Sequence, residues 1–273
     1  MSDYDLRFAG IARLYGMKAL AQFRQSHVCV IGIGGVGSWV AEALARSGIG
    51  QLTLIDLDDV CISNINRQLH ALTDTIGQDK VAVMASRIQA INPECQVHQI
   101  ADFIAIDNLA QFITPDLDYV VDAIDSIKAK VALLAFCKRH KIKVISTGGA
   151  GGQTDPTQIQ IADLTQTVND PLLAKVRNCL RRDYNFSRNP KRRFGIDCVY
   201  STEQLKYPQP DGSVCQQKPA VSAEDEAPGS MRLDCSGGFG ATMVVTASFG
   251  LAAASRVLLK LQQKALQAND SSC

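Results

Sequence analysis

The sequence has almost no excess of charge, because its 273 residues include 28 basic and 27 acidic ones and give a net charge of +1. A global attraction to nucleic acid or to an anionic membrane is therefore excluded, and any such surface has to be local. Paired cysteines are also missing: none of the nine cysteines stands in a C-x-x-C motif, which argues against a structural zinc site. With an odd cysteine count and no signal peptide, we expect a reduced, cytoplasmic protein.

Charge is absent from residues 237–255, a stretch long enough to be flagged as a transmembrane segment. It is rich in Gly, Ala, Ser and Thr, and small residues are typical of a helix packed closely against other elements. We therefore expect no membrane span but a buried helix over about 242–267.

Apolar runs alternate with helical patterns along the chain. Strands are predicted at 27–33, 52–56, 96–100, 117–122, 143–146 and 158–162. Helices are predicted at 36–47, 78–91, 126–140 (capped by Ser126) and 172–182. This alternation predicts a Rossmann-like, doubly wound α/β fold with a mostly parallel sheet.

The composition of the sequence changes after the last predicted parallel strand, and this change helps to divide the chain into three parts. We expect an N-terminal arm (1–25), a nucleotide-binding core (26–165) and a C-terminal part that faces the substrate (166–273), all within one domain overall. The polar, Pro- and Gly-bearing stretch at about 209–230 is predicted to be a mobile loop.

Glycines follow the first predicted strand in "VIGIGGVGSW", with the spacing G-x-G-x-x-G. Such a turn lets phosphates approach the backbone at a helix N-terminus, and the candidate residues are Gly32, Gly34, Gly35 and Gly37. Asp56 ends the next strand, where a carboxylate can accept hydrogen bonds from ribose hydroxyls. NAD, FAD and ATP all fit this pattern.

Polar residues at later strand ends favour ATP. The stretches that carry them supply Asp58, Asn64, Asn66, Arg67 and Gln68, then Lys80, and then Asp122 and Asp125. Residues beyond the carboxyl ends of parallel strands face one crevice. Hydride transfer does not need such a set, whereas phosphoryl or nucleotidyl transfer does: cations offset phosphate charge, and a carboxylate can hold Mg²⁺.

The motifs "GIGGVGSW", "LTLIDLDDV", "SNINRQ", "GQDKV" and "VDAIDS" resemble, in order and spacing, the ubiquitin-activating-enzyme-like (HesA/MoeB/ThiF) superfamily. A narrower resemblance, to the bacterial tRNA threonylcarbamoyladenosine dehydratases, covers nearly the whole chain. It rests on "RFAGIARLYG", "STGGAGGQTDPTQIQIADL", "YPQPDG" and "DCSGGFGATMV". The resemblance implies a C-terminal extension of the adenylating-enzyme type.

The resemblance also implies a role for each matching residue. Asp56, beside Asp58, should bind the ATP ribose; Asn64, Arg67 and Lys80 should bind phosphates; Asp125 should bind Mg²⁺. The resemblance also implies a homodimer, in which an arginine of the partner's N-terminal arm, Arg13 or Arg7, should reach the γ-phosphate of ATP. Two positions depart from the pattern: the zinc cysteine pairs of some relatives are missing, and Ser126 replaces the usual asparagine.

The implied reaction is ligase-type: ATP adenylates the threonyl carboxylate of threonylcarbamoyladenosine in tRNA, and ring closure then expels AMP with net loss of water. Arg67, Lys80 and Asp125 would carry the catalysis. Cys235 is a candidate nucleophile, because a loop cysteine accepts the acyl group in protein-activating relatives. A buried thiol is the alternative.

Basic residues gather between positions 175 and 193, where eight cations stand against one acid, Asp183. Tyr184 and Phe186 lie among them, so this segment is predicted to contact tRNA; a solvated face is the alternative. Three other functions stay open: adenylation of the C-terminus of a ubiquitin-like or sulfur-carrier protein, an NAD(P) oxidoreductase, and a non-catalytic partner in a sulfur-relay (cysteine desulfurase) complex.

Overall fold

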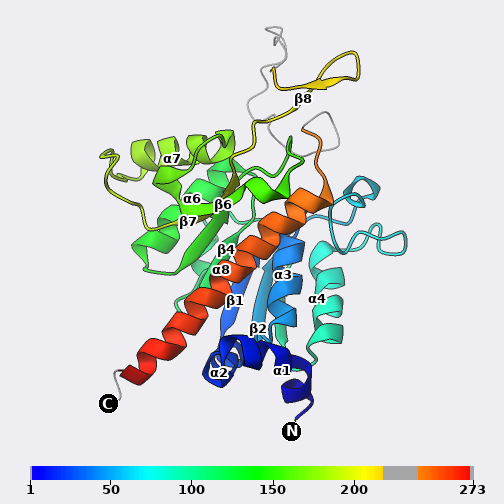
Figure 1. Cartoon of the computed structure of the whole chain (residues 1–273), viewed down its shortest axis with the longest axis vertical. Coiled ribbons are helices and arrows are strands. Elements are labelled where there is room, and N and C mark those ends of the chain that lie inside the picture. Colours follow the sequence, from blue (N-terminus) through cyan, green and yellow to red (C-terminus); the bar gives the residue numbers. More distant parts are fainter. Residues whose placement is uncertain (1, 218–238, 271–273) are drawn as a thin grey trace.

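The computed structural model describes residues 2–217 and 239–270. Its centre is a seven-stranded sheet with the strand order β3-β2-β1-β4-β5-β7-β6. The strands are β1 (His27–Ile31), β2 (Gln51–Ile55), β3 (Gln96–Ile100), β4 (Tyr119–Asp122), β5 (Val144–Thr147), β6 (Ile159–Asp163) and β7 (Asp197–Ser201). All neighbours are parallel except β6 and β7, which pair antiparallel at one edge (Figure 1). The predicted mostly parallel α/β fold is confirmed.

Helices cover both faces of this sheet. One hydrophobic cluster includes α3 (Gly37–Arg46), α4 (Lys80–Ile91) and α8 (Met243–Asp270). A second includes α5 (Leu109–Phe112), α6 (Ile127–Arg139) and α7 (Pro171–Asp183). Short 3-10 turns lie at η1 (Ile62–Asn64), η2 (Pro156–Gln158) and η3 (Leu164–Gln166). The predicted strands and helices lie within three residues of their expected bounds.

The expected cap of α6 is wrong in its detail. Ser126 occupies the capping position, but its side chain makes no capping hydrogen bond. The helix is instead held by its buried face.

The small residues of α8 allow it to pack closely on α3. A Cβ at Gly250 would lie 2.6 Å from the Val36 carbonyl oxygen, so the two backbones touch. By length and a mean hydropathy of 1.5, Met243–Gln267 could cross a membrane, yet 56% of its most apolar window is buried inside the protein. Phe249, Val257 and Leu261 are buried in the core, which confirms the predicted buried helix.

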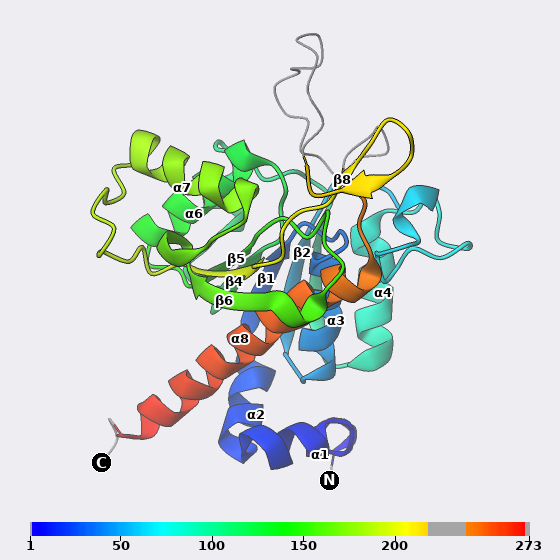
Figure 2. The same ribbon diagram turned by 45° about the horizontal axis from the view of Figure 1, so that its top comes forward.

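The N-terminal arm forms two helices that the sequence analysis does not anticipate, α1 (Asp3–Tyr15) and α2 (Met17–Gln25). The Tyr4 hydroxyl donates to the Gly48 carbonyl at 2.6 Å, and the Gly50 N–H donates to the Phe23 carbonyl at 3.0 Å. Because these glycines precede β2, the arm lies at the amino ends of the strands. Figure 2 shows α1 and α2 at the opposite end of the molecule from β8.

The C-terminal part shares the same sheet as the core. β7 lies between β5 and β6, so a boundary at residue 165 divides the sequence but not the sheet. Within the stretch expected to be a mobile loop, β9 (Val214–Cys215) pairs antiparallel with β8 (Tyr207–Pro208), which lies just before that stretch. The rest of that stretch, from residue 218 to 230, lies outside the described residues.

Candidate nucleotide-binding site

The glycine turn joins β1 to α3 and is as tight as its spacing predicts. Gly32 has a φ of +84°, which side chains rarely adopt, and a Cβ at Gly37 would lie 1.8 Å from the Gly32 carbonyl oxygen. A Cβ at Gly32 would also lie 2.9 Å from the Ala123 carbonyl oxygen. The turn therefore lies against the chain that leaves β4, two residues before Asp125.

Asp56 is fixed at the end of β2 by the backbone. Its Oδ2 accepts from the Ile33 N–H at 2.6 Å and its Oδ1 from the Asp58 N–H at 2.9 Å. Lys80 begins α4, as predicted, and its buried Nζ lies 2.8 Å from Asp58 and 3.9 Å from Asp56. Burial raises the pKa of Asp56, and the Lys80 charge and the two backbone hydrogen bonds oppose this rise.

Arg67 lies directly over the glycine turn. Its Cγ would be 3.3 Å from a Cβ at Gly35, and its carbonyl accepts the Trp39 indole N–H at 3.1 Å. Asn64 is buried beside it, and its Oδ1 accepts from the Cys61 N–H at 3.1 Å, which closes the η1 turn. These bonds hold the "SNINRQ" segment against the turn.

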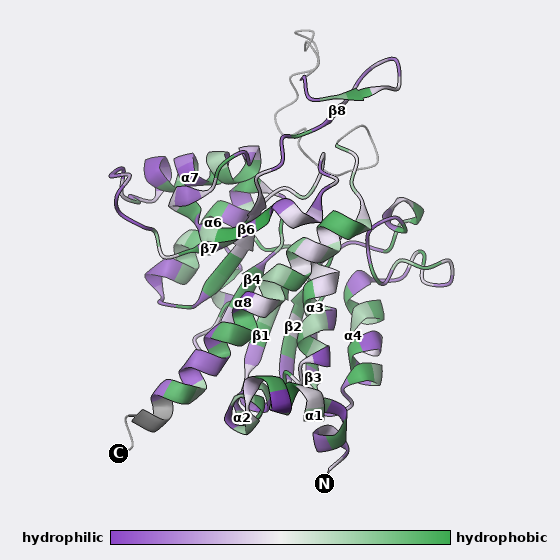
Figure 3. Ribbon diagram, in the orientation of Figure 1, coloured by the Kyte–Doolittle hydropathy of each residue, from purple (hydrophilic) through white to green (hydrophobic). Residues whose placement is uncertain are grey.

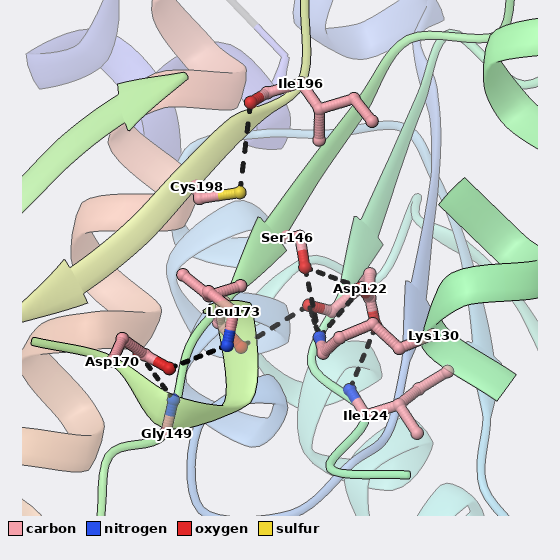
Figure 4. A network of polar contacts seen from close by, with 10 residues as sticks. Asp122, Ile124, Lys130, Ser146, Gly149, Asp170, Leu173, Ile196 and Cys198 are labelled. Carbon is pink, nitrogen blue, oxygen red and sulfur yellow. Dashed lines mark hydrogen bonds and ion pairs between the residues drawn. The ribbon is translucent and has the colours of Figure 1, made fainter. Parts of the chain in front are cut away.

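Asp122 does not face the crevice, and the sequence-based expectation for it is wrong. Its carboxylate is fully buried, 2.8 Å from Lys130 Nζ and 2.7 Å from Ser146 Oγ (Figure 4). The Lys130 side chain reaches from α6 to β4, which sequence spacing did not reveal. Asp122 Oδ1 also accepts from the Ile124 N–H at 3.2 Å, so it anchors the chain that leads to Asp125. Asp125 itself is exposed.

One predicted site residue is not brought to the turn. Arg13 is exposed in the last turn of α1, at the amino ends of the strands and therefore at the end of the sheet opposite the turn. Within a single chain it lies away from the turn. Cys235 lies outside the described residues.

The structure adds His70, which was not predicted as a site residue, and buries it close to the predicted Gln68. Gln68 and His70 are 7% and 2% exposed, and Gln68 Oε1 and both His70 ring nitrogens have no hydrogen-bond partner in the described part of the chain. Burial, together with the Lys80 charge, lowers the pKa of His70 to about 4. His70 is therefore neutral beside the cluster. Its position after Arg67 is the one sequence signal that could have indicated it.

The structure thus gathers the glycine turn, Asp56, Asp58, Asn64, Arg67, Lys80 and Asp125 at the carboxyl ends of β1, β2 and β4. A crevice of this kind binds nucleotides in open α/β sheets. This combination of a helix N-terminus, cations and carboxylates suits the binding of a nucleoside triphosphate.

Comparison with known proteins supports this geometry. The model of the ThiF family matches residues 7–271. A tRNA threonylcarbamoyladenosine dehydratase of Haemophilus influenzae is 56% identical over 264 residues, 97% of this chain and 96% of that protein. One of Escherichia coli is 56% identical over 259 residues, 95% of this chain and 94% of that protein.

A crystal structure of the E. coli tRNA N6-threonylcarbamoyladenosine dehydratase in complex with ATP is also similar. It has a TM-score of 0.85 and 50% identity, and the match covers 97% of this chain and 98% of that one. Both halves of the chain take part in these matches. The chain therefore belongs to the ThiF family and, within it, to the tRNA threonylcarbamoyladenosine dehydratases.

Proposed function

We propose that this protein is an ATP-dependent dehydratase that cyclises threonylcarbamoyladenosine in tRNA. The observation that carries the proposal is a likeness of 56% identity to dehydratases over 97% of the chain. It includes the C-terminal half as well as the nucleotide crevice, and a relative that is 50% identical binds ATP in a crystal structure.

The chain's own residues would bind ATP at the glycine turn. The backbone N–H groups at the start of α3 favour phosphate, and Arg67 over Gly35 offers a guanidinium to the same groups. Lys80 adds a buried cation next to Asp56. Asp56, already fixed by two backbone N–H groups, keeps lone pairs that can accept the ribose hydroxyls. These contacts would place the α-phosphorus at the carboxyl end of the sheet.

Adenylation replaces a poor leaving group by a good one. A threonyl carboxylate oxygen bonds to the α-phosphorus while pyrophosphate leaves, and Arg67 and Lys80 offset the charge that develops. A group in the same modified side chain then attacks the acyl carbon, and AMP leaves with the former carboxylate oxygen. That oxygen and the released protons account for the lost water. This route requires no nucleophile from the protein, so Cys235 is a secondary candidate.

Mg²⁺ fits this site only as an ion shared with the phosphates. Among residues 2–217 and 239–270 there is no group of three or more His, Cys, Asp or Glu side chains that could hold a metal. Mg²⁺, however, commonly binds one carboxylate together with substrate phosphates and water. Asp125, exposed and held next to the turn, would be that carboxylate. The ion would supply charge neutralisation at the α-phosphate.

A homodimer would complete the site if the partner's arm supplies Arg13 to the γ-phosphate. The arm of each chain lies at the amino ends of its strands, away from its own crevice at their carboxyl ends. This position supports a contribution of Arg13 to the crevice of the other copy. A tRNA substrate, together with free thiols at the described cysteines, supports a cytoplasmic location.

The experiment is incubation of the protein with ATP, Mg²⁺ and tRNA that carries threonylcarbamoyladenosine, followed by nucleoside mass spectrometry. We expect loss of one water from the nucleoside, with AMP and pyrophosphate as co-products. Calorimetry should show binding of ATP and not of NAD. If instead a ubiquitin-like protein acquires AMP at its C-terminus and the tRNA is unchanged, the alternative adenylation function is correct.

A further inference from the structure

A pocket of about 480 Å³ lies between the last turn of α6 and the chain that follows α7. Basic and aromatic side chains dominate its lining: Lys138, Arg139, Tyr184, Phe186, Arg192 and Arg193. Two of these cations come from α6, outside the basic segment that the sequence analysis singled out. Figure 3 shows mainly hydrophilic colouring along the loop after α7.

Several cations of the segment between 175 and 193 serve the fold instead of a ligand. Arg177 donates to the Leu164 and Thr167 carbonyls at 3.0 and 3.1 Å, and burial lowers its pKa. Arg182 forms an ion pair with Asp183 at 2.7 Å. Arg181 lies over the Phe194 ring, 5.5 Å from its centroid. These three arginines are therefore removed from the set of residues that is predicted to bind RNA.

The remaining cations at the pocket are available to a ligand. Arg139, Arg192 and Arg193 are exposed, and within the described ranges none has a side-chain hydrogen bond or ion pair. Lys138 donates to the Gly195 carbonyl at 3.3 Å, which ties α6 to the loop. No acidic side chain lines the pocket. Unpaired guanidinium groups around an aromatic-walled hollow suit a phosphate with a neighbouring base, because guanidinium binds phosphate in a bidentate manner and aromatic rings stack on bases.

The helix α6 connects this pocket to the nucleotide crevice. It starts two residues after Asp125 and has 13 residues, so its length is about 20 Å at ~1.5 Å per residue. The last residue of this helix, Arg139, lines the pocket. That length corresponds to roughly six steps of a stacked nucleic-acid strand at ~3.4 Å each. A strand whose modified base lies in the crevice would therefore place its backbone, several nucleotides away, at the pocket.

We propose that the α6–loop pocket, defined by the six residues above, binds the sugar-phosphate backbone and one unstacked base of the tRNA at a distance from the reacting nucleoside. This inference rests on the proposed function, since it takes tRNA as the substrate. It assigns the pocket to substrate docking and not to chemistry.

The test compares the double variant Arg139→Gln/Arg192→Gln, one residue from each wall, with the control Lys18→Gln/Lys260→Gln. The control removes the same charge from α2 and α8, on the other face of the sheet. Binding of tRNA is measured by fluorescence anisotropy across a salt series, and kcat, KM and ATP affinity are measured alongside.

For the pocket variant we expect tRNA binding weaker by on the order of 10-fold at ~0.1 M salt, with a log–log salt slope reduced by up to roughly 1.4–1.8. KM for tRNA should rise in parallel, while kcat at saturation and ATP affinity stay at the wild-type values. The control variant should match the wild type throughout.

Equal affinity and parallel salt lines for the pocket variant and the wild type would overturn the pocket assignment. Loss of binding to anionic lipid vesicles with unchanged tRNA binding would also overturn it, in favour of a membrane contact. The proposed function fails separately: a wild-type protein that binds tRNA but forms no cyclic product would contradict the dehydratase reaction and leave the pocket assignment standing.

Discussion

Replacing Lys130 by methionine should destabilise the protein strongly, although Lys130 touches no ligand. Its Nζ lies 2.8 Å from Asp122 Oδ2 and 3.1 Å from Ser146 Oγ, and the side chains of Lys130 and Asp122 are both 0% exposed. Methionine fills a similar volume without the charge. The substitution therefore leaves a buried carboxylate without its cation.

The expected loss is about 3–5 kcal/mol, the usual result of removing one partner of a buried ion pair. This is a large part of the roughly 5–15 kcal/mol that stabilises a typical folded protein. With an m-value of about 3 kcal/mol per M, the urea midpoint should fall by roughly 1–1.7 M. Removing both charges in Asp122→Asn/Lys130→Met should recover part of the loss.

Equilibrium urea unfolding, followed by far-UV circular dichroism, measures these changes. Lys128→Met is the matched control, because Lys128 is an exposed lysine on the same helix. It should change the unfolding free energy by no more than about 0.5 kcal/mol. A loss below about 1 kcal/mol for Lys130→Met, or an equal loss for Lys128→Met, would refute the reasoning.

Three further predictions concern the site and its surroundings. Asp125→Asn should lower kcat on the order of 10³-fold while calorimetry still detects ATP binding, because a metal-holding carboxylate acts mainly in the transition state; near-normal turnover would contradict its role. Cys235→Ser should keep appreciable dehydration, and complete loss of product in a variant that still binds ATP would favour a thioester step. In the folded state the pKa of His70 is lowered from 6.5 to about 4. Below pH 6.5 the unfolded chain therefore binds a proton at His70 that the folded chain does not bind, and stability is lost as the pH falls. In His70→Leu the loss between pH 7 and 5 should be smaller by up to about 2 kcal/mol, and urea titrations with equal pH dependence would contradict this.

Local signals explain why so much of the crevice was predictable. The glycine spacing, the apolar strands and the residues that follow each strand are all read from neighbours in the chain, and a parallel sheet brings its carboxyl strand ends together. Asp56, Arg67 and Lys80 were therefore expected near the turn, and the structure brings them there.

Features that depend on side-chain direction or on a distant element were not predictable in this way. Asp122 looked like a free strand-end carboxylate, because only the packing of α6 shows that Lys130 reaches it. Arg177 belonged to a basic run, but α7 turns it inward to backbone carbonyls. The arm lacks a clear single-period pattern, so α1 and α2 were missed. β7 was missed because its apolar run, Cys198–Tyr200, is only three residues long.

The hydrogen bond between Trp39 and the Arg67 carbonyl gives the protein a built-in optical probe. The chain contains a single tryptophan, and its half-buried indole N–H is bonded to the segment that lies over the glycine turn. Indole emission responds to the hydrogen bonding and polarity around the ring. A nucleotide that shifts Arg67 would therefore change the emission of the unlabelled protein, whereas a ligand held only at the far end of α6 would leave it unchanged. The emission of Trp39 therefore reports filling of the nucleotide site alone, even when tRNA is present in the same solution.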